Sequence, residues 1–219
     1  MWGYGPEGAA YPVRRGEMWR AGSHLFICES AFEVESPPDE AFLVYCDPPW
    51  NQALMTGFYT KAGLPKSSLT WLDLYRRIIV LAAGGPCFIE GGEKWADEVA
   101  GVCRFAGEVY ARWPITYYRK HPGVLHYVGP PLPGGFDPSG LDDDDTPGAV
   151  LAAFADDRTQ LVVDPCAGRG VTSRAAAEAG WASVNIELHP ARVSAALDRL
   201  AKKTGLEPRK VTAKMGLTT

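Results

Sequence analysis

The sequence lacks the cysteine patterns on which small secreted proteins and zinc-binding domains depend. It has five cysteines, an odd number, and no two of them form a C-x-x-C pair. A chain of 219 residues is also long enough to bury a core without disulfide bonds. We therefore expect reduced thiols, a cytoplasmic location and no metal centre.

Long apolar runs and a surplus of basic charge are also missing. The longest apolar stretch without charge, residues 78–89, is about half as long as a membrane-spanning helix and is broken by Gly84, Gly85 and Pro86. No apolar signal core stands at the N-terminus. The 22 basic and 26 acidic residues give a formal charge of −4, so no overall positive field favours nucleic acid. We expect a globular protein that does not span a membrane and that contacts any polyanion, such as nucleic acid, through local basic patches.

Strand-like and helix-like segments alternate along most of the chain. The apolar run 41–46 predicts a parallel strand buried on both faces, which ends before Pro48 and Pro49 because proline cannot donate to a strand ladder. Further strands are expected at 86–89, 161–163 and 182–186, and helices between Thr70 and Gly84 and at 93–105, 146–154, 172–179 and 190–203. The runs 108–118 and 123–128 predict an antiparallel hairpin, and residues 51–68 a long loop. This pattern predicts an α/β fold with a mostly parallel sheet and an antiparallel hairpin at one edge.

The length favours a single domain that spans residues 1–219. Residues 1–40 are expected to form an N-terminal extension, in which Trp2, Tyr4 and Trp19 pack as a small lid or edge and residues 23–28 are compatible with a short strand. Residues 129–145 are rich in Pro, Gly and Asp and predict a mobile surface loop. Residues 204–219 predict a basic tail.

A glycine-rich turn after a buried strand predicts a ligand site. It runs from Asp164 to Gly170 and leads into a helix, so its glycines permit close approach and the free amides of the helix start offer polar contacts. The Asp164 carboxylate suits an ammonium group, and Glu187 ends the next strand, where an acid can accept hydrogen bonds from both hydroxyls of a ribose. A cofactor with a ribose and an ammonium group fits both positions. The alternatives are a plain connection between strand and helix for the turn, and a solvated acid that caps the helix at Pro190 for Glu187.

A second motif, Asp47-Pro48-Pro49-Trp50, follows the strand 41–46. Its consecutive prolines form a rigid elbow that presents a carboxylate, a carbonyl and an aromatic face together. These groups can hold an exocyclic amine, because Asp47 and the Pro48 carbonyl each accept one N–H while Trp50 stacks on the ring. The nitrogen lone pair then points toward an electrophile. The alternative is a kinked loop with a packed tryptophan.

Taken together, these segments resemble a known family. The runs 47–51 (DPPWN), 164–172 (DPCAGRGVT) and 186–190 (IELHP) are similar to motifs of the S-adenosylmethionine-dependent amino-methyltransferases of DNA. Their order, with the DPPW tetrapeptide before the cofactor loop, resembles the circularly permuted β group of that family, and Thr146-Pro147 is similar to the Lys-Pro segment that precedes its cofactor strand. The resemblance covers residues 41 to about 200. Cys166, Arg169 and Val171 stand where the family usually has Phe, Ser and Thr, and only residues 112–145 are available as a target-recognition insert.

The resemblance implies a Rossmann-like methyltransferase sheet and methyl transfer from S-adenosylmethionine to the N6 amine of adenine in DNA, as in restriction-modification systems. Adenine is favoured because Asp rather than Ser stands at the head of the tetrapeptide. The catalytic residues that it implies are Asp47, Pro48, Pro49 and Trp50. The cofactor-binding residues that it implies are Asp164, Pro165, Cys166, Ala167, Gly168, Gly170, Thr172 and Glu187. The alternatives are a cytosine-N4 DNA methyltransferase, an adenine-N6 RNA methyltransferase, and a catalytically silent methyltransferase-like subunit that binds nucleic acid.

Basic residues near the tip of the predicted hairpin are the expected contacts with DNA. Arg112, Arg119 and Lys120 are placed to follow phosphates, and the tyrosines between them to stack on bases, unless the hairpin is simply solvated with a tyrosine face. Members of the resembled group often pair, and a homodimer would place two such patches along one duplex. DNA, with RNA as the less favoured partner, would place the protein in the cytoplasm or at the nucleoid.

Overall fold

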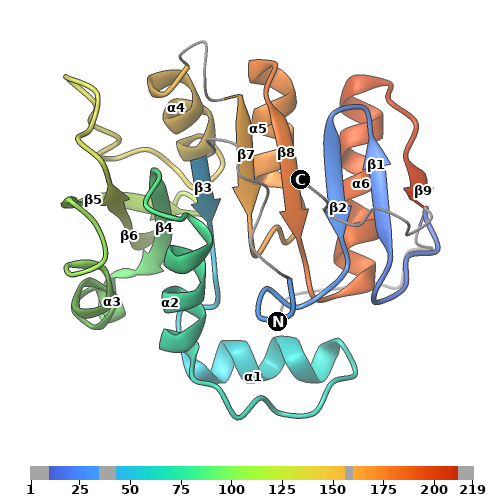
Figure 1. Ribbon diagram of the computed structural model, residues 1–219, viewed down its shortest axis with the longest axis horizontal. Coiled ribbons are helices and arrows are strands. Elements are labelled where there is room, and N and C mark those ends of the chain that lie inside the picture. The colour runs from blue at the N-terminus through green and yellow to red at the C-terminus, as the bar shows by residue number, and fades with distance from the viewer. Residues whose placement is uncertain (1–9, 35–42, 156–159, 212–219) are drawn as a thin grey trace.

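The structure is a computed structural model that describes residues 10–34, 43–155 and 160–211. Its strands are β1 (Met18–Ala21), β2 (His24–Ile27), β3 (Leu43–Cys46), β4 (Cys87–Gly92), β5 (Val109–Tyr117), β6 (His121–Gly129), β7 (Leu161–Asp164), β8 (Ala182–Ile186) and β9 (Arg209–Val211). Its helices are α1 (Gln52–Lys61), α2 (Trp71–Leu81), α3 (Ala96–Cys103), α4 (Thr146–Ala153), α5 (Val171–Ala179) and α6 (Pro190–Thr204), with a short 3-10 helix η1 (Glu93–Trp95) before α3. The strands form one sheet in the order β5-β6-β4-β3-β7-β8-β2-β1-β9 (Figure 1).

The centre of the sheet is parallel. In the row β4, β3, β7, β8 and β2, each strand pairs in parallel with its neighbours. Strands β6 and β5 continue the sheet as an antiparallel hairpin at one edge. The α/β fold and its edge hairpin are therefore confirmed. The predicted strand 41–46 is observed from Leu43, since residues 41 and 42 lie outside the described residues.

At the opposite edge of the sheet the short strand expected within residues 23–28 is observed as β2, whereas β1 and β9 were not predicted. Residues expected to be an extension supply β2, which pairs in parallel with β8, and β1, which forms a hairpin with β2. Strand β9, from the expected tail, pairs antiparallel with β1. These strands have only three or four residues each, too few to show a period of two in the sequence. Trp19 is buried in β1, whereas the predicted packing of Trp2 and Tyr4 concerns residues outside the described ones.

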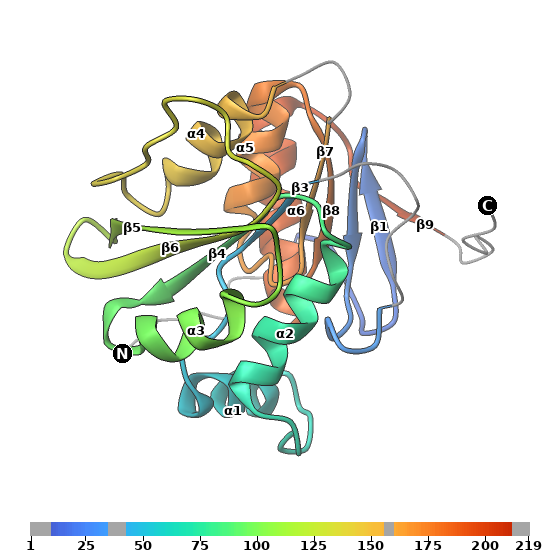
Figure 2. The ribbon, with the colours of Figure 1, turned by 60° about the vertical axis from the view of Figure 1, so that its left-hand side comes forward.

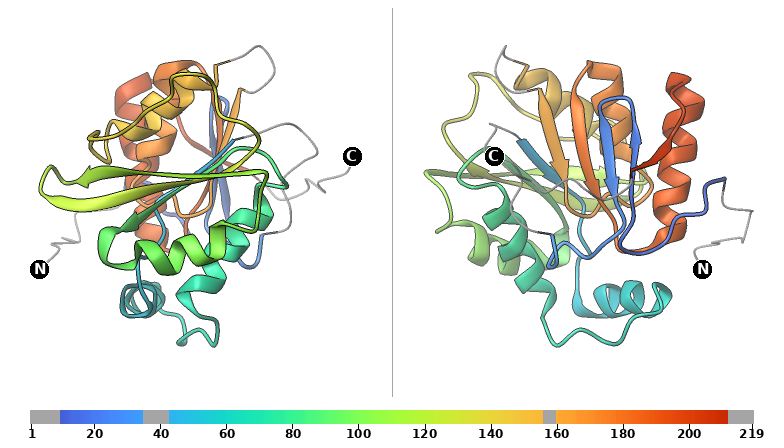
Figure 3. Two further views of the ribbon diagram at one scale, coloured as in Figure 1. Left: turned by 90° about the vertical axis from the view of Figure 1, so that its left-hand side faces the viewer. Right: turned by 45° about the vertical axis from the view of Figure 1, so that its right-hand side comes forward.

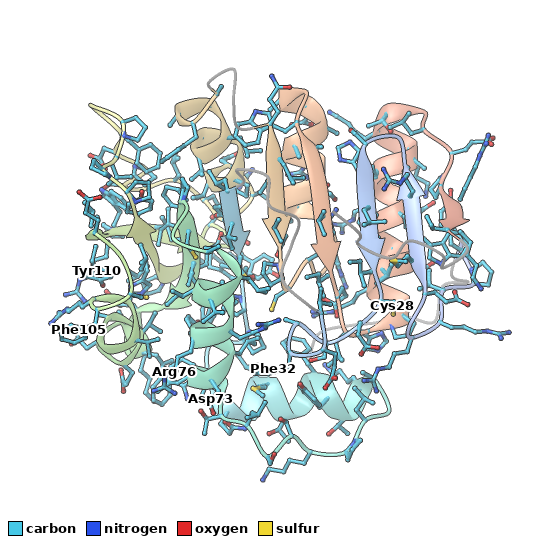
Figure 4. The ribbon with its side chains drawn as sticks, in the orientation of Figure 1. Cys28, Phe32, Asp73, Arg76, Phe105 and Tyr110 are labelled. Carbon is cyan, nitrogen blue, oxygen red and sulfur yellow. The ribbon has the colours of Figure 1, made fainter. Side chains whose placement is uncertain are left out.

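Helices cover both faces of the sheet, as Figure 2 shows from the side. Val44 and Ile89 belong to a buried cluster with α2 and α3. Their neighbours Tyr45 and Phe88 point to the other face and belong to a cluster with α4 and α5. Helix α6 packs on β1 and β2 around Cys28 (Figure 4), and the side view in Figure 3 shows it beside α5 on that same face. The result is a three-layer α/β/α arrangement.

Helix α1 is the main correction to the predicted secondary structure, because residues 51–68 were expected to be a loop. Asn51 caps the helix by accepting a hydrogen bond from the Leu54 amide (3.0 Å). Within α1 only Met55 is buried, so the segment carries no apolar stripe by which a helix can be recognised. The helix lies across the carboxyl ends of β7 and β8 (Figure 1).

Helix α2, by contrast, follows its prediction. Thr70 caps it through a reciprocal capping box with Asp73. Asp73 also pairs with Arg76 on the outer side of the helix (2.7 Å; Figure 4). The predicted helix 93–105 is shorter than expected, since its first turn is η1 and α3 ends at Cys103.

The segment 129–145, expected to be a mobile surface loop, is anchored to the edge hairpin. The Thr116 amide donates to the Leu141 carbonyl (2.8 Å), and the Thr116 hydroxyl donates to Asp142 Oδ1 (2.8 Å). Phe136 packs edge-on against Phe88, with 5.6 Å between ring centroids. Its aromatic and backbone contacts make this segment a cover over the β5 side of the sheet.

No helix of the described residues combines the length and the apolar character needed to span a membrane. The five cysteines are all free thiols. Within the described part of the chain, no cluster of three or more His, Cys, Asp or Glu side chains is arranged to hold a metal ion.

Candidate active site

Asp47, Pro48, Pro49 and Trp50 lie at the carboxyl end of β3, near the middle of the sheet. The strand ends at Cys46 because the prolines that follow cannot extend its ladder. The indole N–H of Trp50 donates to Asp47 Oδ1 (3.0 Å). The tetrapeptide is therefore a closed turn in which the first and last side chains are joined.

Asp47 has a second partner that the sequence analysis did not identify. The hydroxyl of Tyr117, the last residue of β5, donates to Asp47 Oδ2. The Tyr117 ring stands edge-on to Trp50, with 4.6 Å between centroids and 70° between planes. The available signal was the alternation along β5, because Ile115 is buried and Tyr117 points to the same face.

Gly92, at the end of β4, makes room for the tryptophan of this turn. A Cβ atom at Gly92 would lie only 2.6 Å from Trp50 Cε3, closer than any real carbon contact. The end of β4 thus supports the ring of Trp50, and any side chain at Gly92 would displace it.

A second carboxyl, that of Glu90, lies beside Asp47 on the neighbouring strand. Glu90 is 1% exposed, and its Oε1 accepts a hydrogen bond from the Tyr45 hydroxyl while its Oε2 has no partner among the described residues. The sequence analysis did not select Glu90, although a charged residue inside the apolar run of β4 was a visible signal.

The pKa values of these two neighbouring carboxyls are both raised. Burial raises the pKa of Asp47, against the opposing effect of the hydrogen bonds from Tyr117 and Trp50. Burial and then the Asp47 charge raise the pKa of Glu90 well above its usual range. Asp47 has two hydrogen-bond donors and Glu90 has one, so the pKa of Glu90 is raised further than that of Asp47.

The predicted cofactor turn follows β7 directly. Asp164 is 3% exposed, and its side chain accepts hydrogen bonds from the Cys166 amide (3.1 Å) and from the Thr172 side chain. Burial raises the pKa of Asp164 to about 7, and the Asp47 charge adds to this effect. The Ala167 amide donates to the Ile186 carbonyl (2.8 Å), which ties the turn to the end of β8.

The other residues of the turn lie with these. Pro165 and Ala167 are buried, and the thiol of Cys166 is within hydrogen-bond reach of the Cys46 thiol. Gly168 and Gly170 both have positive φ (54° and 80°). A Cβ atom at Gly170 would strike Ser173 and Ala196, whereas at Gly168 its nearest neighbour would be the Cys166 carbonyl at 3.8 Å. Gly170 is therefore required by packing on α6, and Gly168 leaves open space beside the turn.

Glu187 ends β8 and faces this space. Its Oε2 accepts a hydrogen bond from the Gly168 amide (2.9 Å), and its Oε1 accepts one from the His189 amide (2.8 Å). Glu187 is buried rather than solvated; it stabilises the turn before α6 and borders the glycine turn, and its role toward a ribose stays a prediction. A carboxylate has about four lone-pair positions, so these two bonds leave it capacity to accept hydroxyl donors of a ribose.

Arg192, in the first turn of α6, connects the parts of the site. Its guanidinium pairs with Glu187 (3.8 Å) and lies over the ring of Phe58 in α1, 4.3 Å from the centroid. Its charge lowers the pKa of both Asp47 and Glu187. The charge of Arg192 therefore acts on both Asp47 and Glu187, and its contact with Phe58 places α1 beside them.

The predicted nucleic-acid contacts are only partly brought together. Arg119 and Lys120 are exposed in the turn between β5 and β6. Arg112 lies further back along β5, opposite His126, and pairs with Asp97 (2.8 Å). The exposed basic tip is therefore formed by Arg119 and Lys120 without Arg112.

Comparison with models of protein families finds no match, and neither does comparison with curated proteins. Solved structures do match. M1.HpyAVI in complex with SAM superposes with a TM-score of 0.57 at 14% identity, over 81% of this chain and 98% of that chain. TTHA0409 of Thermus thermophilus, described as a DNA modification methylase and complexed with S-adenosyl-L-methionine, gives 0.56 at 19% identity, over 81% and 93%.

PvuII DNA methyltransferase, specific for cytosine N4, gives a TM-score of 0.53 at 12% identity, over 88% of both chains. The protein shares the fold of these methyltransferases. The identities are all below 20%, so the likeness is one of fold. It extends over 81–88% of this chain.

Proposed function

We propose that the protein transfers a methyl group from S-adenosylmethionine to the N6 amine of adenine in DNA. The proposal rests on one observation: the tetrapeptide and the glycine turn, which are far apart in the chain, follow neighbouring strands at one edge of the sheet. Strands β3 and β7 pair directly, so Asp47 and Asp164 end neighbouring parallel strands although they are far apart in the chain. Ligands of open α/β sheets bind at this carboxyl edge.

The residues around the glycine turn fit the cofactor. Glu187 would accept hydrogen bonds from the ribose hydroxyls, Asp164 would face the ammonium group, and Gly168 leaves the space beside the turn open. When bound, S-adenosylmethionine supplies an electrophilic methyl group. The buried carboxylates favour a cationic ligand, because each of them is costly to ionise without a positive partner.

The tetrapeptide would hold and orient the target amine. Asp47 and the Pro48 carbonyl each accept one N–H, which directs the nitrogen lone pair away from these acceptors, while Trp50 stacks on the ring. The Asp47 carboxylate stabilises the positive charge that develops on the amine. A base in a duplex must first leave the stack, at a cost of a few kcal/mol.

Adenine is proposed over cytosine because Asp stands at the head of the tetrapeptide in the permuted DPPW group that the sequence resembles. The likeness to that group rests on the order of the two motifs in the sequence, with the tetrapeptide before the glycine turn. A cytosine-N4 activity is the second candidate, favoured by the likeness to a cytosine-N4-specific enzyme. Methylation of RNA and a silent binding subunit are the further alternatives.

Contact with DNA is proposed for Arg119 and Lys120 at the hairpin tip. Arg112 is a weaker candidate than its position in the sequence indicated, because Asp97 already neutralises it. One exposed tip on a chain of net charge −4 offers few phosphate contacts, so we also propose a homodimer that presents two tips.

The test is incubation with isotopically labelled S-adenosylmethionine and a mixture of DNA, RNA and protein, followed by mass spectrometry of the digested nucleosides. Labelled N6-methyldeoxyadenosine is the expected product. N4-methyldeoxycytidine would replace adenine by cytosine as the target, and N6-methyladenosine would replace DNA by RNA. Absence of label in every nucleoside, with cofactor binding intact, would contradict the proposed methyltransferase activity and favour the silent subunit.

A further inference from the structure

The Asp47 carboxylate is already in contact with two donors of its own chain. Oδ1 accepts from the indole of Trp50, at the other end of the same turn. Oδ2 accepts from Tyr117, which belongs to β5, a strand separated from β3 by β6 and β4. The second bond therefore reaches across two strands and is independent of the tetrapeptide.

Tyr117 also contacts the tryptophan of the turn. Gly92 of β4 pairs with Gly123 of β6, and Gly123 pairs with Ile115 of β5, so the two strands between β5 and β3 carry no side chains in the row just before Tyr117. The Tyr117 hydroxyl donates to Asp47, and its ring contacts Trp50. These are the two interactions, an N–H or O–H on Asp47 and an aromatic contact with Trp50, that a target base would make.

The turn that follows Tyr117 is strained. Tyr118 and Arg119 both have positive φ (52° and 56°), a left-handed conformation that residues other than glycine rarely adopt. The turn is held by two carboxylates of the segment 129–145. Asp143 Oδ1 accepts from the Tyr118 amide (3.0 Å) and Asp142 Oδ1 from the Arg119 amide (2.7 Å).

We propose that Tyr117 is a positioning residue that takes the place of the target amine on Asp47 in the free protein and is displaced when the amine binds. The identity of the amine rests on the proposed function. The hydrogen bond from Tyr117 to Asp47 is independent of that function. Displacement exchanges one donor on Asp47 Oδ2 for another, so the carboxylate is never left without a partner.

The first measurement follows the Asp47 carboxyl by carbon-13 NMR as the pH is varied, with the signal assigned through Asp47→Asn. Other charged or titratable groups that act on Asp47 or are acted on by it come from every element around it: Tyr45, Cys46, Tyr75, Glu90, Tyr118, Asp143, Asp164, Cys166 and Arg192. These groups are unchanged in Tyr117→Phe, which removes only the hydroxyl and keeps the ring against Trp50.

In Tyr117→Phe the Asp47 midpoint should rise by about one pH unit, since a hydrogen bond to the charged form is lost. The matched control is Tyr110→Phe, which removes a hydroxyl from the same strand. The Tyr110 hydroxyl is hydrogen-bonded to His126 of β6 (3.1 Å) rather than to Asp47, so the Asp47 midpoint should stay in place. In the wild type the Tyr117 Cζ resonance should titrate with Asp47, a readout that needs no variant to fold.

The second measurement tests displacement in the wild type. A duplex that the protein is found to methylate is compared with the same duplex in which purine, which has no exocyclic amine, replaces the target adenine. The adenine duplex should shift the Tyr117 Cζ resonance and the purine duplex should not. Equal shifts with both would overturn the displacement.

The two hypotheses fail in different ways. An Asp47 midpoint that is equal in wild type and Tyr117→Phe overturns the role of Tyr117, whatever the protein methylates. A shifted midpoint in a protein that methylates no nucleic acid overturns the proposed function and leaves Tyr117 as the residue that positions Asp47.

Discussion

Buried carboxyls are costly, and this protein gathers four of them at one edge of its sheet. Glu90, Asp164 and Glu187 are 1%, 3% and 8% exposed, and Asp47 is half-buried beside them. Burial is the main cause that raises the pKa of each one. Such a cluster gains most from a cationic ligand, which is the physical reason to expect a sulfonium and ammonium cofactor and an amine that becomes positive.

The Asp47 side chain should be needed for turnover but not for cofactor binding. Asp47→Ala removes the acceptor of the target amine, and we expect turnover to fall by about two to three orders of magnitude, as for the loss of a preorganised polar group. Calorimetry should find cofactor affinity nearly unchanged. Asp97→Ala, at an exposed aspartate that pairs with Arg112, is the control and should keep full turnover. Wild-type rates in Asp47→Ala would reduce the tetrapeptide to a structural turn.

Cofactor affinity should depend on the two sides of the open space beside the glycine turn. Glu187→Ala should weaken binding by about 1–3 kcal/mol through lost hydrogen bonds to a charged group. Gly168→Val should block binding sterically, because its side chain would enter that space. Gly180→Val is the matched control, since Gly180 also has positive φ and open surroundings but lies at the end of α5. Unchanged affinity in both site variants would refute the assignment of the cofactor site.

Cofactor binding should become tighter as the pH rises from about 5.5 to 7.5. The pKa of Asp164 is raised to about 7, so below that value the carboxyl is protonated and attracts an ammonium group less. The same shift means that the free protein loses stability as the pH rises through 7, because the folded state binds the proton more tightly than the unfolded chain. Titration calorimetry at several pH values checks the affinity. The slope should vanish in Asp164→Asn, and a slope that persists there would point to another group.

Among the elements, the end of β4 decides the position of Trp50. Gly92 has an ordinary φ of −74°, so alanine is compatible with its backbone, but a Cβ atom would collide with the indole. We expect Gly92→Ala to lower turnover about tenfold or more by displacing Trp50, while cofactor affinity is kept. The control is Gly101→Ala in α3, where nothing lies within 4 Å of the new Cβ atom and helix propensity should add about 0.4–1 kcal/mol of stability. Full activity in Gly92→Ala would mean that Trp50 need not hold this position.

At the scale of the whole molecule, the proposed contact with DNA would have to overcome a net charge of −4. Arg119→Ala combined with Lys120→Ala should weaken DNA binding and lower the salt slope by about one for each lost phosphate contact. Fluorescence anisotropy across a range of salt concentrations measures the slope, and Arg112→Ala serves as the comparison because Asp97 already pairs with it. Light scattering of the wild type should give the mass of a dimer. An unchanged slope together with a monomer would leave single-stranded or partner-delivered substrate as the better explanation.

The sequence by itself determined the elements whose signals are local. The buried strands β3 and β7 contain apolar runs, α2 has its capping box, and the hairpin β5–β6 has two β-rich runs around a basic turn. Both chemical motifs were found in the same way, because a rigid Asp-Pro-Pro-Trp elbow and a glycine turn are each defined within a few residues.

Only the tertiary structure decided what depends on pairing across the sheet. The short strands β1, β2 and β9 are stabilised by their neighbours rather than by their own pattern, and α1 is placed by its cap and by contacts such as Phe58 with Arg192. Tyr117 and Glu90 reach the site because sheet order brings β5 and β4 to the same side of β3. Such contacts join residues that are far apart in the chain, so no local period or propensity records them.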